Sequence, residues 1–238
     1  MLSSPDWVVT STCRSHTSTP ADASFGESLA SFNLSDKSDL VTRFQDAPVA
    51  CHRFDKSVPI STYIYSLVAG AYSVTFPKEA DVDPQIPMRL LCRKSLAEHV
   101  EKMKDDWFRI TIRAIRFYEI MFNTPYPFDK LDQTFCPDYR MGAMENVGNI
   151  TYNDEYVPRN ENFTRVKMEN IYNTITHEIS HMWFGNLVTM EWWDDLWLNE
   201  SFANMISFMC MDEAEGLEDI TLAWNIFLGE NFWGLGTD

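Results

Sequence analysis

The chain has 238 residues, of which 45% are hydrophobic and 23% are charged, and its formal net charge is −16. This composition is typical of a globular protein and excludes an intrinsically disordered chain, a collagen and a small disulfide-rich scaffold. The acidic balance also argues against a general nucleic-acid-binding protein, because the phosphate groups would be repelled.

Residues 1–82 are predicted to form a strand-rich module. The stretch 57–76 combines many β-branched and aromatic residues, which favour strands over helices. A linker or turn is expected at 81–87, where two prolines interrupt the pattern. We therefore place a domain boundary between residues 82 and 83.

Residues 83–238 are predicted to form a mixed module, so the expected fold class is α+β. The first elements of this module are a strand at 88–93 and a helix that begins near Ser95. Apolar residues recur in this helix at nearly 3.6-residue spacing. Asn123 and the two prolines that follow it are expected to end the helix.

Two further helices are predicted downstream. Within 164–184, Ile171, Ile175 and Ile179 follow one another in steps of four, which places them on one helix face. A later helix around Glu200 is expected to end by residue 216. Its predicted apolar face consists of Leu198, Phe202, Met205, Ile206 and Met209.

The segment His177-Glu178-Ile179-Ser180-His181 predicts a metal site. Histidines four positions apart lie about 40° apart around a helix, so both imidazoles can reach one zinc ion. Glu178 projects beside them, close enough to hold a water molecule. Glu200 follows His181 after eighteen intervening residues and supplies a third candidate ligand. Two histidines and one glutamate leave a fourth position open, which is typical of catalytic zinc sites.

Charge is unevenly distributed along the chain. Residues 151–238 contain 16 acidic and 3 basic residues, and no Lys or Arg follows Lys167. Most of these acids are expected on a solvated surface, but their field also favours bound cations. Asn199, beside Glu200, has two alternative interpretations: a hydrogen-bond partner of a ligand imidazole, or an N-terminal helix cap.

These residues resemble the aminopeptidase N family of zinc metallopeptidases, which are gluzincins with a thermolysin-like catalytic domain. The resemblance rests on Gly142-Ala143-Met144-Glu145-Asn146 and on the segment 177–203. Residues 59–70 are similar to the end of the family's N-terminal β-sheet domain, and residues 117–133 to the start of its mixed α/β catalytic domain. The resemblance therefore implies an internal fragment: the last part of one domain at 1–82 and the first part of the next at 83–238.

The resemblance also implies roles for single residues. Zinc would be the cofactor, His177, His181 and Glu200 its ligands, and Glu178 the general base. Glu145 would bind the free α-amino group of a peptide. The other implied substrate-binding residues are Gly142 and Ala143, which let a backbone approach closely, Met144 and Asn146, which complete the motif, and Met141, which would line the pocket for the first side chain.

The activity implied is removal of single N-terminal residues from peptides by a metal-activated water. Three alternatives stay open: a thermolysin-like endopeptidase, the epoxide-hydrolysing branch, which typically has Gly where this chain has Ala143, and an inactive or truncated zinc-binding module. The family also uses an upstream glutamine and a downstream oxyanion tyrosine, whereas no tyrosine follows Tyr172 here.

The expected partners are peptides with a free N-terminal amine, with no nucleic acid. No sequence stretch predicts contact with a membrane, and the oligomeric state is left open. The five cysteines are scattered and the first ten residues do not resemble a secretory signal. A cytoplasmic location is therefore expected.

Overall fold

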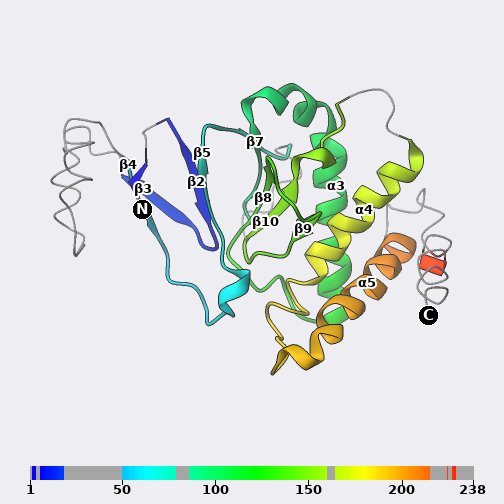
Figure 1. Ribbon diagram of the computed structural model, residues 1–238. Helices are drawn as coiled ribbons and strands as arrows, with labels where there is room; N and C mark the ends of the chain where they lie inside the picture. The colour runs from blue at the N-terminus through cyan, green and yellow to red at the C-terminus, as the bar shows by residue number, and fades with distance from the viewer. Residues whose placement is uncertain are drawn as a thin grey trace.

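The fold combines a strand-rich N-terminal part with a body of sheet and helices, in agreement with a mixed α and β class (Figure 1). The structure is a computed structural model. It describes residues 2–3, 6–18, 50–78, 86–159, 164–214, 224 and 227–228. The predicted boundary between residues 82 and 83, most of the predicted linker and the expected helix end at 216 lie outside these ranges.

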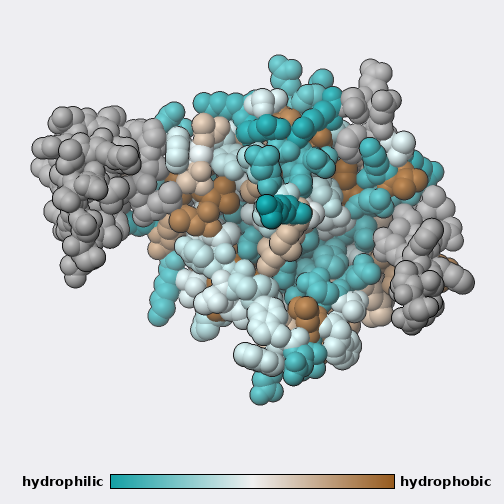
Figure 2. Space-filling model, viewed as in Figure 1, coloured by the Kyte–Doolittle hydropathy of each residue, from teal (hydrophilic) through white to brown (hydrophobic). Residues whose placement is uncertain are grey.

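The N-terminal strands pair in two small antiparallel sheets within the described ranges. One has the spatial order β1-β4-β3, with β1 at Leu2–Ser3, β4 at Ala50–Phe54 and β3 at Ser15–Ser18. The other pairs β2 (Val8–Ser11) with β5 (Leu67–Gly70). A short 3₁₀ helix, η1 (Thr62–Ile64), precedes β5. In Figure 2 hydrophobic residues gather over the β2–β5 pair.

A five-stranded sheet forms the centre of the described body, in the spatial order β6-β7-β8-β10-β9. Its strands are β6 (Tyr72–Thr75), β7 (Met88–Arg93), β8 (Leu131–Cys136), β9 (Ala143–Met144) and β10 (Asn149–Asn153). The three central strands are parallel, and both edge strands run antiparallel to their neighbours. The predicted strand at 88–93 is confirmed, and the sheet begins with a strand that precedes residue 83.

Three α-helices of the described ranges cover one side of this sheet (Figure 1): α3 (Ala97–Phe122), α4 (Arg165–Ser180) and α5 (Leu196–Glu213). The short 3₁₀ helices η3 (Lys94–Leu96), η4 (Asp154–Tyr156) and η5 (Trp193–Asp195) lie in the connections. The predicted end of the first helix is confirmed, because Asn123 adopts a left-handed conformation with φ of 47° and caps it. Within the described part, no helix has the length and hydrophobicity needed to cross a membrane.

The helices meet around a buried tyrosine. The Tyr118 hydroxyl of α3 lies 3.0 Å from the Thr176 carbonyl oxygen of α4 and 3.4 Å from the Ile206 carbonyl oxygen of α5. The predicted apolar face of α4 is confirmed, since its three isoleucines are buried. A hydrogen bond from Ser207 to Asn173 also joins α5 to α4. These contacts fix α4 and α5, the two helices that carry the predicted ligands, against each other and against α3.

The predicted apolar face of α5 is partly wrong. Leu198 and Met205 are each 39% exposed, whereas Ala203 and Ser207 are fully buried. The reason is that α5 packs closely against α4, and small side chains at the contact allow the backbones to approach. The buried face therefore overlaps the predicted one only in part: Ile206 is buried, and Phe202 and Met209 are partly buried against the core.

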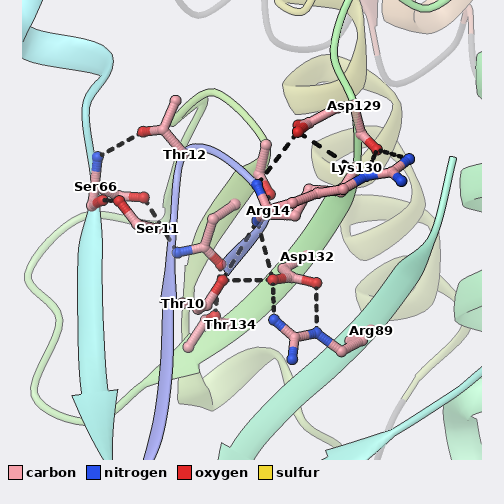
Figure 3. A network of polar contacts seen from close by, with 12 residues as sticks. Thr10, Ser11, Thr12, Arg14, Ser66, Arg89, Asp129, Lys130, Asp132 and Thr134 are labelled. Atoms are coloured by element: carbon pink, nitrogen blue, oxygen red, sulfur yellow. Dashed lines mark hydrogen bonds and ion pairs between the residues drawn. The ribbon is translucent and has the colours of Figure 1, made fainter. Parts of the chain in front are cut away.

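A buried polar network joins the N-terminal strands to the central sheet (Figure 3). Asp132 on β8 accepts hydrogen bonds from Thr10, from Lys130 at 3.0 Å and from Arg89 at 2.6 and 2.9 Å. Lys130 also donates to the Gly148 carbonyl at 2.6 Å. Gly148 has φ of +66°, and a Cβ there would lie 2.2 Å from the Thr12 carbonyl oxygen. The network therefore fixes the loop that follows β9.

Candidate active site

The C-terminal end of α4 carries the two predicted histidine ligands. Thr164 caps the start of the helix by accepting a hydrogen bond from the Lys167 amide. His177 lies in the last turn and His181 is the C-terminal cap residue. The Nε2 atoms of the two rings are 3.0 Å apart. His181 Nδ1 lies 2.9 Å from the Phe184 carbonyl oxygen, which fixes the orientation of the ring and directs Nε2 toward His177.

Glu200, in the second turn of α5, completes the predicted ligand set. Its Oε2 atom is 3.5 Å from His177 Nε2 and 3.7 Å from His181 Nε2. A tetrahedral zinc ion with bonds of about 2.0–2.2 Å separates its ligand atoms by about 3.3–3.6 Å. The observed distances lie close to that value, so this donor set fits zinc. The half-exposed Glu200 side chain leaves one side of the cluster open to solvent.

The charges of the cluster favour a cation at its centre. Hydrogen bonds from His177 and His181 hold the pKa of Glu200 well below its usual range. Burial lowers the pKa of His177. Burial also opposes charge on His181, but its hydrogen bond to Glu200 and three nearby carboxylates outweigh this effect and raise its pKa to about 9. The negative end of the α4 dipole adds to the same preference for positive charge.

Glu178 is buried beside the histidines. Its Oε2 atom has no hydrogen-bond partner among the described residues. Burial is the main cause that raises its pKa to about 8, and the negative charges of Glu145 and Glu200 act in the same direction. A buried carboxyl group whose pKa lies near neutral is suited to accept and release a proton.

Strand β9 places the predicted amine-binding motif at the edge of the central sheet. Glu145 follows this strand and is 4% exposed. Its backbone carbonyl accepts a hydrogen bond from Asn186 Nδ2 at 2.8 Å, and its Oε1 atom accepts one from Asn199 Nδ2 at 3.2 Å. Asn146, next in the chain, accepts a hydrogen bond from Thr151 and so stabilises the turn into β10.

The rest of the motif lies at the surface end of β9. Met141 is 55% exposed and Gly142 is also exposed, while Ala143 and Met144 are half-buried. A Cβ at Gly142 would lie 3.0 Å from the Tyr156 hydroxyl oxygen, so a larger residue would crowd this approach.

Neither predicted role of Asn199 is observed. Helix α5 begins at Leu196, so Asn199 lies inside the helix and Asp195 is at the cap position. The ring of His181 is held by the Phe184 carbonyl instead. The Asn199 amide contacts carboxylates, because its position on α5 directs it toward β9 rather than toward the imidazoles.

Two residues near Glu145 were not singled out from the sequence. Asn186 binds the Glu145 backbone, and Tyr63 lies 3.5 Å from Asn199 Nδ2 and packs edge-on against Trp193 at 5.3 Å. Tyr63 is in a segment that the sequence assigned to the strand-rich module. No local pattern signals its approach to the site, because it depends on how η1 packs against the loop after β9.

Comparison with known proteins adds a family match and several relatives. Residues 107–233 match the family described as the Peptidase family M1 domain. Aminopeptidase N of Streptomyces lividans is 44% identical over 164 residues, which is 68% of this chain and 19% of that protein. Aminopeptidase N of Lactobacillus helveticus is 40% identical over 177 residues, 74% of this chain and 20% of the relative. "Aminopeptidase M1-D" of Oryza sativa subsp. japonica is 34% identical over 166 residues, 69% of this chain and 18% of its own length. The chain thus spans about a fifth of the length of these relatives.

Proposed function

The chain belongs to the peptidase M1 family, and from this membership and the site geometry we propose that it carries the catalytic centre of a zinc-dependent aminopeptidase. The observation that supports the proposal most directly is the convergence of His177, His181 and Glu200. Their ligand atoms all lie within 4.8 Å of one another, although Glu200 comes from a different helix.

A zinc ion held by these residues would polarise a peptide carbonyl group and lower the pKa of water toward about 7. Glu178 would accept a proton from the attacking water and pass it to the leaving amine. Such proton transfer contributes about 10²–10⁴ in rate. Its burial next to the two histidines supports this role, because a carboxyl group shielded from bulk water can hold the proton between the two transfers.

Glu145 would select substrates by their N-terminus. A carboxylate pairs with an ammonium group but not with a mid-chain amide, so a peptide would be held by its first residue. Strand β9 is an edge of the five-stranded sheet, and the backbone of an extended peptide could pair with it. One residue would therefore be removed at a time.

Met141 would line the pocket for the first side chain. It is exposed directly before Gly142, where its flexible thioether could contact several kinds of side chain. If this is so, replacement by Ala will change the relative rates for Leu, Arg and Ala substrates. Unchanged relative rates would remove Met141 from the proposal.

Zinc content tests the metal site. We expect about one zinc ion per purified chain and a strong loss of zinc in Glu200→Ala. Glu191→Ala is a matched control, because Glu191 is an exposed acid in the connection between α4 and α5 and lies outside the cluster. A wild-type chain without zinc, or equal zinc in Glu200→Ala, would contradict the proposal.

Ligand binding tests selection by the amine. Leucine hydroxamate, which has a free α-amino group, should bind the zinc-loaded chain at least about tenfold more tightly than its N-acetylated form. Glu145→Gln should remove most of this preference, while zinc content stays unchanged. Equal binding of the two probes by the wild-type chain would exclude an amine-anchoring site.

A further inference from the structure

A single amide group connects the proposed amine anchor with the proposed metal ligand. Asn199 is 3% exposed, and its Nδ2 atom lies 3.2 Å from Glu145 Oε1 and 3.4 Å from Glu200 Oε1. Two neighbouring carboxylates repel each other, and a neutral donor shared between them offsets part of that repulsion. The Asn199 amide can therefore hold both carboxylates in place.

The absence of a side chain at Gly185 makes room for this amide. Asn199 Oδ1 lies against Gly185, where a Cβ would be only 2.2 Å from it. Gly185 has φ of +120°, a conformation that favours glycine. With its oxygen on the Gly185 side, the Asn199 amide directs its nitrogen toward the carboxylates.

Tyr63 reaches the same amide from the N-terminal part of the chain. Its hydroxyl oxygen lies 3.5 Å from Asn199 Nδ2, and burial together with the charges of Glu145 and Glu200 raises its pKa to about 12. The hydroxyl group therefore stays protonated beside two carboxylates. Its ring packs edge-on against Trp193, so the side chain is held from both ends.

The backbone around Tyr63 is attached to the loop that carries Glu145. The Val147 amide donates to the Ile64 carbonyl at 3.0 Å, and Asn149 Nδ2 donates to Ser66 Oγ at 3.2 Å. Ser66 is in turn bonded to Ser11 on β2 (Figure 3). Segments about 80 residues apart in the sequence are thus fixed side by side.

We propose that Asn199 and Tyr63 are positioning residues that set the orientation of the Glu145 carboxylate and thereby the preference of the site for a free α-amino group. This inference rests on the proposed function, because it assigns Glu145 to the substrate amine. Without the amide, Glu145 Oε1 would lose this hydrogen bond, and the carboxylate would no longer be held in its present orientation. The N-terminal strand-rich part would thus contribute directly to specificity.

The test compares leucine hydroxamate with N-acetyl-leucine hydroxamate on the zinc-loaded chain by calorimetry. Asn199→Leu, which keeps a similar volume but has no donor, should lower the free-amine preference about tenfold. Tyr63→Phe removes a single oxygen atom and should lower the preference about threefold. Zinc content and the unfolding midpoint of each variant are measured alongside.

Matched controls use the same substitutions nearby. Asn204→Leu changes a residue five positions after Asn199 on α5. Tyr65→Phe changes an exposed residue two positions after Tyr63. Both should keep the wild-type preference. A double-mutant cycle separates positioning from a general structural role: in a Glu145→Gln background, Asn199→Leu should have no further effect on the preference.

The outcomes separate this inference from the proposed function. A wild-type preference that Glu145→Gln removes, but that survives both Asn199→Leu and Tyr63→Phe, overturns the inference and leaves the proposed function intact. An equal loss of affinity for both probes also overturns it, because that result indicates general damage. A wild-type chain without any preference overturns both.

Discussion

Glu178 is a residue whose environment favours chemistry over stability. An ionised carboxylate that is buried with one oxygen unpaired costs free energy, and in this site two further carboxylates add repulsion. Such a cost persists in a protein when the group has a function that a neutral side chain cannot perform. Under the proposed function, the same residue would link the stability of the fold to catalysis.

Replacing Glu178 by Gln should make the metal-free chain more stable. The amide keeps the shape and is neutral in both states, whereas Glu178 must take up a proton on folding because its pKa is raised to about 8, so we expect a gain of about 1–3 kcal/mol in the free energy of unfolding at pH 7. Urea unfolding in the presence of a metal chelator measures this change in the free energy of unfolding. Glu169→Gln on the same helix should have the opposite effect, because buried Glu169 accepts a hydrogen bond from Arg165 at 2.8 Å. Lower stability of Glu178→Gln would show that its carboxylate has a stabilising partner.

Gly185 should tolerate no side chain. Ala at this position combines an unfavourable positive φ with a contact of 2.2 Å to Asn199 Oδ1 and one of 3.2 Å to His181 Nδ1. We expect Gly185→Ala to cost about 1–3 kcal/mol in unfolding free energy and to weaken zinc binding. Gly70→Ala is the comparison, since its new methyl group would meet only the movable ring of Tyr72 at 3.0 Å. Equal effects of the two variants would refute this explanation.

Helices α4 and α5 show which features of the secondary-structure elements could be predicted from the sequence and which could not. The steps of four in α4 predicted both its buried isoleucines and the shared face of His177 and His181, because these depend only on helix geometry. The buried face of α5 was mispredicted at Leu198 and Met205, because close packing against α4 selects small side chains. A hydrophobicity scale ranks residue types by their free energy of transfer from water. It carries no information about how closely two helices approach each other.

The link between β2 and β8 depends on a charged residue and therefore on pH. Burial alone would raise the pKa of Asp132, but its bonds from Arg89 and Lys130 outweigh burial and lower the pKa. A carboxyl group with a lowered pKa in the folded state contributes stability above its unfolded value of about 4 and loses it as the pH falls. The link between β2 and β8 should therefore weaken at acidic pH.

Asp132→Asn should lower the free energy of unfolding by about 3 kcal/mol at pH 7, because Arg89 and Lys130 lose their charged partner. The difference from wild type should shrink as the pH falls below about 4. Asp105→Asn breaks an exposed ion pair with Lys78 and should cost less than about 1 kcal/mol. A constant difference across the pH range would show that the charge of Asp132 does not carry the effect.

At the scale of the whole molecule, the net charge of −16 opposes the compact state through self-repulsion. Salt screens such repulsion, so raising NaCl from about 0.01 to about 0.5 M should increase the free energy of unfolding by about 1 kcal/mol at pH 7. The effect should disappear near the sequence pI of about 4.6. Loss of stability with salt at pH 7 would mean that attractive ion pairs dominate.

The site could be predicted from the sequence where its geometry is local. The four-residue spacing predicted that His177 and His181 lie together on one helix face, and the structure brings Glu200 to the same place, whereas their role as metal ligands stays a prediction. The positions of Tyr63 and Asn186 could not be predicted, because they reach Glu145 only through contacts between distant segments. Side chains that share one helix face can be recognised from their spacing in a sequence. The residues that contact them from distant segments can be identified only once the fold is known.

Strand β6 belongs to the central sheet although it precedes residue 83, and this limits where the chain could be cut or recombined. A piece that started at residue 83 would expose the edge of β7 and would lack both Tyr63 and the Thr10 bond to Asp132. Exposed strand edges recruit other chains. Recombination in this region would therefore be expected to exchange the segment from β2 onward as one block, although the proposed zinc ligands all lie after residue 176.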